Sequence, residues 1–168
     1  MEIYMKNVVY VGSFDPAHNG HLNTYRKASC ILNERIKICI CYNELKPQGM
    51  FSIDERIAIA KALFHTNDIC SFKNYYEIKQ LIESSDLIVR GYRKTDENAE
   101  KEYSAKLLSY LGLQELKDRL FFVDIDEEYE SVSSSLIREY AKTDINSISQ
   151  FLNEESFRIA KHILLNNR

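Results

Sequence analysis

The hydrophobic residues of this chain fall into short blocks of two kinds, which alternate along the sequence. Some blocks are nearly continuous, as in strands that are buried on both faces of a parallel sheet. These blocks are residues 8–11, 35–42, 69–72, 86–89 and 120–124. The other blocks have apolar residues at helical spacing, which predicts amphipathic helices. They are residues 22–32, 52–64, 75–83, 99–111, 136–143 and 154–165.

Strands that alternate with helices indicate a parallel sheet, because each connection must cross back over one face of the sheet. We therefore predict an α/β fold, with a Rossmann-like parallel sheet of about five strands and helices on both faces. The chain has 168 residues, which is enough for one core and too few for two ordinary domains. Residues 1–168 are therefore expected to form a single domain.

Composition narrows the class of protein. The formal net charge is −3 with charges of both signs, which argues against a protein that coats nucleic acid. The longest apolar runs, such as Ile36 to Tyr42, are too short to span a bilayer, and the polar opening from Met1 to Lys6 is unlike a signal peptide. We expect a soluble protein of the cytoplasm that binds neither nucleic acid nor a membrane.

Four cysteines, Cys30, Cys39, Cys41 and Cys70, occur without any C-x-x-C pair. A cytoplasmic chain rarely keeps disulfides, so we predict that all four are buried, small apolar residues. Cys39 and Cys41 lie two positions apart in a predicted strand and therefore share one face of it.

The residues with the strongest chemical character follow the first predicted strand. Gly12 to Pro16 predicts a tight turn, and His18 to His21 opens the next helix. A glycine lets a phosphate approach the backbone, and the N-terminus of a helix favours an anion. A zinc site is disfavoured, because the two histidines have no third ligand nearby. The arrangement of strand, turn and helix thus predicts a phosphate site.

Three further polar segments follow other predicted strands. Lys46 comes after the second strand, Arg90 to Arg93 ends the fourth, and Ser133 to Ser135 with Arg138 opens the helix after the fifth. Parallel sheets bind ligands outside the carboxyl ends of their strands. We therefore expect these segments to converge on one crevice, where arginines suit bidentate contacts with phosphate oxygens.

These segments resemble a known family. G-S-F-D-P with H-N-G-H at 12–21 resembles the signature of the nucleotidylyltransferase superfamily, including its H-x-G-H motif. M-F-S-I-D-E-R at 50–56, R-G-Y-R at 90–93 and V-S-S-S-L-I-R at 132–138 resemble segments of the phosphopantetheine adenylyltransferase family. The resemblance covers about residues 7–165 and keeps the segments in order.

The resemblance implies transfer of an adenylyl group from ATP to 4′-phosphopantetheine, with Mg²⁺, to give dephospho-coenzyme A and pyrophosphate. It implies a homo-oligomer, often a hexamer. It also implies that Ser13, His21 and Lys46 are catalytic, and that Ser13, Lys46 and Arg90 hold the acceptor. The implied ATP site comprises Gly12, Ser13, Phe14, His18, His21, Arg90, Gly91, Arg93, Glu102, Ser133, Ser134, Ser135 and Arg138.

The sequence shows no nucleophile with an adjacent base, so we expect direct in-line attack by the acceptor phosphate on the α-phosphorus of ATP. Two other functions remain open. One is adenylyl or cytidylyl transfer to another small phosphorylated acceptor, such as nicotinate mononucleotide, against which R-G-Y-R at 90–93 argues. The other is nucleotide binding without turnover, against which the intact Ser13, His21 and Arg90 argue.

Overall fold

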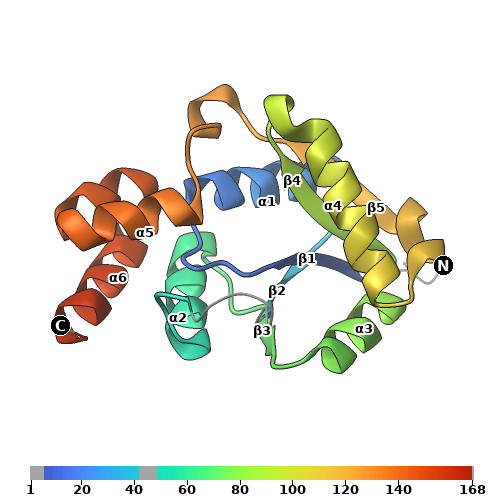
Figure 1. Cartoon of the computed structure of the whole chain (residues 1–168), viewed down its shortest axis with the longest axis horizontal. Coiled ribbons are helices and arrows are strands. Elements are labelled where there is room, and N and C mark those ends of the chain that lie inside the picture. The colour runs from blue at the N-terminus through green and yellow to red at the C-terminus, as the bar shows by residue number, and fades with distance from the viewer. Residues whose placement is uncertain (1–5, 42–48, 168) are drawn as a thin grey trace.

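Among the residues that the structure describes, five parallel strands form one sheet in the order β3-β2-β1-β4-β5 (Figure 1). The structure is a computed structural model that describes residues 6–41 and 49–167. The strands are β1 (Val8–Gly12), β2 (Ile36–Cys41), β3 (Ile69–Phe72), β4 (Leu87–Tyr92) and β5 (Leu120–Asp124). The chain runs outward from β1 to β3 and then returns to the other side of β1. The carboxyl ends of β1 and β4 therefore flank the switch point where such sheets bind ligands.

In the part of the chain that the structure describes, six α-helices connect and cover the strands. They are α1 (Asn19–Leu32), α2 (Ile53–Phe64), α3 (Tyr75–Ser84), α4 (Glu97–Tyr110), α5 (Ser134–Thr143) and α6 (Glu154–Asn166). The predicted strands and helices are therefore confirmed, although α1, α4 and α5 begin two or three residues earlier than predicted. Within residues 6–41 and 49–167 there are also four 3-10 helices, which were not predicted: η1 (Lys94–Asp96), η2 (Gln114–Arg119), η3 (Glu127–Tyr129) and η4 (Ile145–Phe151).

Alternate residues of β1 face two different hydrophobic cores. Val8 and Tyr10 pack with residues of α1 and α2. Val9, between them, packs with Ile78 of α3 and Leu108 of α4. Helices therefore cover both faces of the sheet, as predicted.

A third core joins the C-terminal helices to α2. Phe51 and Ile59 pack there with Ile137 of α5, Ile148 of η4 and Ala160 of α6. Ser52 begins α2 with a reciprocal cap: its hydroxyl accepts from the Glu55 N–H, and the Glu55 carboxylate accepts from the Ser52 N–H at 2.7 Å. This core brings the start of α5 to the carboxyl end of β1.

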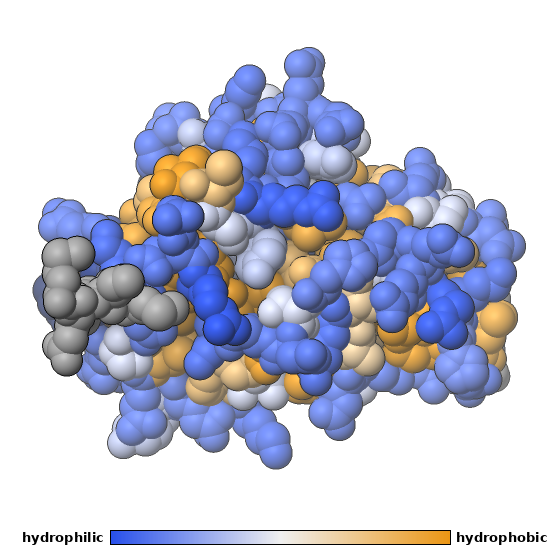
Figure 2. All heavy atoms as spheres, turned by 180° about the vertical axis from the view of Figure 1, so that it is seen from behind, coloured by the Kyte–Doolittle hydropathy of each residue, from blue (hydrophilic) through white to orange (hydrophobic). Residues whose placement is uncertain are grey.

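Burial differs among the four cysteines. Cys39 is buried, Cys41 and Cys70 are half-buried, and Cys30 is exposed. The prediction that all four are buried is therefore confirmed for Cys39 only. Cys41 and Cys70 are partly exposed, and the prediction is wrong for Cys30, which lies on the outer surface of α1. On the face shown in Figure 2, hydrophilic residues predominate and apolar ones appear between them. Within residues 6–41 and 49–167, no helix has the length and apolar character needed to cross a membrane.

Candidate active site

The turn after β1 has a constrained backbone. Phe14 has a φ of 43°, in the left-handed region, and the Asp15–Pro16 peptide bond is cis. A non-glycine residue in this region is strained unless its neighbours hold it. The buried Phe14 ring packs edge-on against Tyr10 and His21, with ring centroids 5.2 and 4.9 Å apart. This packing directs Phe14 inward, and Ser13 beside it is exposed.

His18 and His21 form a reciprocal cap at the start of α1. The His18 Nδ1 accepts from the Gly20 N–H, and the His21 Nδ1 accepts from the His18 N–H, both at 3.2 Å. The two rings lie against each other at an interplanar angle of 30°, with centroids 3.8 Å apart. Since the His21 Nδ1 is an acceptor, a neutral His21 ring carries its proton on Nε2.

Both histidines are uncharged at neutral pH. Burial, followed by the positive charge of Arg90, lowers the pKa of His21 to about 3. Burial lowers the pKa of His18 well below 6.5, and His21 and Arg93 add to this effect. His21 can therefore donate one hydrogen bond from its Nε2–H without carrying a charge.

Asp15 ties the turn after β1 to the segment before α2. Its carboxylate accepts from the N–H groups of Met50 and Phe51, at 3.1 and 3.0 Å. Arg56 forms an ion pair with Asp15 at 3.4 Å, and its Nη1 donates to the Ser13 carbonyl at 3.2 Å. Both charged side chains are buried. The pair therefore fixes the backbone that presents Ser13.

Sequence reasoning gave no role to Asp15 or Arg56. Both residues lie in motifs named above, Asp15 in G-S-F-D-P and Arg56 in M-F-S-I-D-E-R. Their opposite charges were the one feature of the sequence that indicated an ion pair. A contact between residues 41 positions apart follows only from the packing of α2 against the sheet.

Arg90, at the end of β4, is held by helix α4 and by β1. Its Nε and Nη2 lie 2.8 and 2.6 Å from the Glu100 Oε1, and its Nη1 donates to the Val11 carbonyl at 3.0 Å. The Ser104 hydroxyl donates to the same Glu100 oxygen at 3.0 Å.

The glutamate that the sequence predicted for the site is Glu102, which is exposed. Two positions on a helix differ by about 200°, so Glu102 cannot share the inward face with Glu100.

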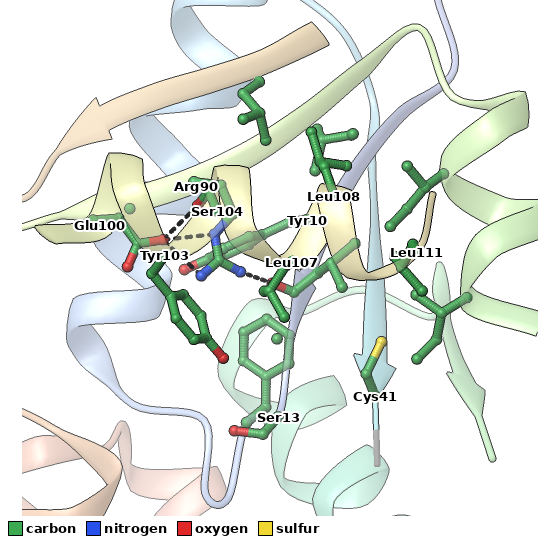
Figure 3. Close-up of a pocket in the computed structure, with 18 of the residues that line it drawn as sticks. Tyr10, Ser13, Cys41, Arg90, Glu100, Tyr103, Ser104, Leu107, Leu108 and Leu111 are labelled. Atoms are coloured by element: carbon green, nitrogen blue, oxygen red, sulfur yellow. Dashed lines mark hydrogen bonds and ion pairs between the residues drawn. The ribbon is translucent and has the colours of Figure 1, made fainter. Parts of the chain in front are cut away.

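A cavity of about 380 Å³ lies between the sheet and helices α3 and α4 (Figure 3). At one end it is polar, where Ser13, Arg90, Glu100 and Tyr103 point into it. His21 also lines the cavity. The rest of the wall is mainly apolar and includes Tyr75, Ile78, Ile82, Leu107, Leu108, Leu111 and Leu120. The cavity can therefore hold a ligand with an anionic head and an apolar body.

The start of α5 docks onto the turn after β1. Ser133 caps α5, and the Ser134 hydroxyl donates to the Pro16 carbonyl at 2.9 Å. Arg138 Nη1 donates to the Asp15 carbonyl at 2.6 Å and lies 3.7 Å from the Asp15 carboxylate. We call this contact region the turn–α5 junction. It places the N-termini of α1 and α5 beside the same turn, and both ends favour an anion.

The end of β4 completes this junction. Arg93 Nη2 donates to the Val132 carbonyl, just before the serines, at 3.0 Å. A Cβ at Gly91 would lie 2.4 Å from the Thr24 hydroxyl, so the close approach of α1 to β4 requires glycine there.

The structure divides the predicted site residues into two groups. Those that line the cavity are Gly12, Ser13, Phe14, His21, Arg90 and Gly91. Those at the turn–α5 junction and the cap of α1 are His18, Arg93, Ser133, Ser134, Ser135 and Arg138. Lys46 lies outside the described residues, and Glu102 is not brought to either group.

The model of the cytidylyltransferase-like family matches residues 9–140, which include both groups. The chain therefore belongs to the cytidylyltransferase-like family. Its relatives include the phosphopantetheine adenylyltransferase of Leptospira biflexa, 32% identical over 152 residues that cover 82% of this chain and 86% of the relative. The phosphopantetheine adenylyltransferase of Syntrophomonas wolfei is 33% identical over 144 residues, which cover 82% and 84%. The resemblance indicated by the motifs is thus confirmed.

A solved structure has the same fold. It is that of TmcAL from Thermotoga maritima bound with alpha-thio ATP, which matches 96% of this chain with a TM-score of 0.64 and 14% identity. The chain spans 56% of that protein.

Proposed function

We propose that this protein transfers an adenylyl group from ATP to 4′-phosphopantetheine and releases dephospho-coenzyme A and pyrophosphate. The relatives named phosphopantetheine adenylyltransferase support this reaction. The observation that supports it most strongly is the cavity beside Ser13 and Arg90, which has a polar end and a mainly apolar wall. The acceptor has matching parts: a phosphate at one end and a long, weakly polar arm.

The polar end of the cavity provides contacts for the acceptor phosphate. Ser13 offers a hydroxyl, His21 a neutral Nε2–H, and Arg90 a fixed positive charge. With the phosphate bound by these groups, one of its oxygens remains available for in-line attack on the α-phosphorus of ATP. Lys46 follows β2, and we propose that it adds charge to the transferring phosphate. Catalysis then consists of positioning and of stabilising charge as it develops.

The turn–α5 junction provides the contacts for ATP. The N-termini of α1 and α5 meet there, and Arg93 and Arg138 add positive charge. We propose that the β- and γ-phosphates lie against Ser133, Ser134 and Ser135. Glu102 lies on the face of α4 opposite Glu100 and does not line the cavity, so no role is proposed for it.

Magnesium fits this site as a partner of ATP rather than as a protein-bound ion. Within the described part of the chain, no three His, Cys, Asp or Glu side chains are placed to hold a metal. The carboxylate of Asp15, in the turn, is already engaged by Arg56. We propose that Mg²⁺ enters on the phosphates of ATP, where it would neutralise charge on the leaving pyrophosphate.

The test is a screen of pyrophosphate release with ATP or CTP and a set of acceptors. We expect ATP with 4′-phosphopantetheine to give the highest kcat/KM, with dephospho-coenzyme A as product. Faster release with nicotinate mononucleotide would overturn the acceptor that we propose. ATP binding without pyrophosphate release for any acceptor would indicate a binding module. The family resemblance also leads us to propose a cytoplasmic location and a homo-oligomer. Sedimentation of the purified protein tests the oligomeric state.

A further inference from the structure

Helix α4 contributes a carboxylate to the polar end of the cavity. Glu100 has one oxygen, Oε1, that receives Arg90 Nε, Arg90 Nη2 and the Ser104 hydroxyl. The side chains of Arg90 and Glu100 are 18% and 21% exposed, and Ser104 is buried. A carboxylate beside a proposed phosphate site repels the ligand, so its presence there requires a reason.

The contacts of Arg90 give that reason. A guanidinium has five N–H donors in a rigid plane. Glu100 engages its Nε and Nη2, and the Val11 carbonyl engages its Nη1. Three of the five N–H groups are thereby directed at protein acceptors within the described residues. Anchors from α4 and from β1 fix the plane of the guanidinium, and its remaining N–H groups can meet a ligand in the cavity.

Glu100 is itself anchored. Ser104 lies one helical turn further along α4 and donates to the oxygen that faces Arg90. The Tyr103 ring, on the same face of α4, lies with its centroid 5.9 Å from the Arg90 Cζ. The order of contacts therefore runs from Ser104 through Glu100 to Arg90 and the cavity.

We propose that Glu100 is a positioning residue, which orients Arg90 toward the phosphate of the acceptor. This inference rests on the proposed function for the identity of the acceptor. Preorganisation of Arg90 avoids the loss of side-chain freedom at the moment of binding. It also restricts the anion to one direction of approach, along the N–H groups that Glu100 and Val11 leave available.

The test compares Glu100→Ala and Glu100→Gln with Glu97→Ala, a control on the same helix whose side chain is 43% exposed and pairs with Lys101 rather than with Arg90. Binding of 4′-phosphopantetheine, of pantetheine without its phosphate, and of ATP is measured by calorimetry. We expect Glu100→Ala to lower the affinity for 4′-phosphopantetheine about tenfold, and the affinities for pantetheine and ATP less than twofold. Glu100→Gln should recover part of the loss, because its amide oxygen still accepts from Arg90. Glu97→Ala should change none of the three.

A double variant separates positioning from a structural role. In an Arg90→Ala background, Glu100→Ala should lower the affinity for 4′-phosphopantetheine less than twofold, because Arg90, through which Glu100 acts, is absent. Equal weakening of all three ligands by Glu100→Ala, or an unchanged loss in the Arg90→Ala background, would overturn the inference.

Inorganic phosphate serves as a probe that is independent of the acceptor. If the wild-type protein does not bind 4′-phosphopantetheine, the proposed function fails, and the same comparison is made with inorganic phosphate. The inference is still supported if Glu100→Ala binds phosphate more weakly than wild type, and if the same substitution has no effect in the Arg90→Ala background. Equal phosphate affinities of the wild-type, Glu100→Ala and Arg90→Ala proteins would overturn it.

Discussion

The cavity and the turn–α5 junction lie on either side of one turn, yet they are built differently. Most of the cavity wall is apolar, and its polar groups gather at one end. At the junction, polar side chains bind backbone carbonyls of other segments, as Ser134 does at Pro16 and Arg138 at Asp15. The junction is therefore defined by local motifs, whereas the cavity is defined by how two helices pack on the sheet.

We propose that this difference separates the two substrates, ATP at the junction and the acceptor in the cavity. A triphosphate needs backbone amides, helix N-termini and arginines, which the junction supplies. A long acceptor needs a wall of matching shape, which α3 and α4 supply. His21 belongs to both regions, since it caps α1 and lines the cavity. Substitutions should therefore affect one substrate or the other, except at His21.

The largest effect is expected at the shared residue. His21→Ala should lower kcat by about 10²-fold or more, with a smaller change in the affinity for ATP, because its Nε2–H contact strengthens as charge develops in the transition state. Steady-state kinetics with both substrates measures this. The exposed His162 gives the matched control His162→Ala, which should retain full activity. Turnover of His21→Ala within a few-fold of wild type would show that the site lies elsewhere.

The next effect belongs to the junction alone. Arg138→Ala should raise the KM for ATP about tenfold, since a charge-assisted contact with phosphate contributes about 1.5–3 kcal/mol. The KM for the acceptor should change little. Arg138→Lys should recover only part, because lysine keeps the charge but loses the planar guanidinium. A rise in the acceptor KM alone would place Arg138 on the other substrate.

A smaller effect should be confined to the cavity. Leu107→Trp fills space beside the apolar wall of the cavity. It should raise the KM for the acceptor about fivefold and leave the KM for ATP unchanged. Lys106→Trp, at the exposed neighbouring position of α4, is the control. The comparison between the two regions breaks down if Leu107→Trp raises the KM for ATP instead.

The smallest effect concerns pH. Because the pKa of His21 is lowered to about 3, kcat/KM should show no inflection from this residue between about pH 5 and 8. The folded pKa lies below the unfolded value of about 6.5, so His21 contributes stability above that pH and loses it as the pH falls toward 3. Thermal unfolding should therefore show a smaller fall in Tm from pH 7.5 to 5 for His21→Gln than for wild type. An equal fall would contradict a neutral, buried His21.

Much of the fold could be predicted from the sequence, because strands buried on both faces read as apolar blocks and the helices carry clear caps, such as Ser52 with Glu55. The 3-10 helices could not, since short irregular segments have no period of their own. Cys41 illustrates a further limit: its position in β2 indicates a strand, but not that it lines a cavity.

The site was predictable where a motif holds its own contacts. The H-N-G-H segment caps its own helix, so His18 and His21 lie together whatever packs around them. Glu100 was missed because matching a glutamate across a longer loop shifts the register by two residues, which selects the opposite face of α4. The buried pair of Asp15 and Arg56 depends on contacts between distant segments, which no local pattern contains.

The central claim is that two substrates bind side by side and react directly. The most direct measurement is the configuration at the α-phosphorus after reaction of a single diastereomer of ATP thiolated at that phosphorus with 4′-phosphopantetheine. One in-line displacement predicts inversion of configuration in the dephospho-coenzyme A analogue. Retention would require two displacements through an adenylylated side chain and would contradict the account.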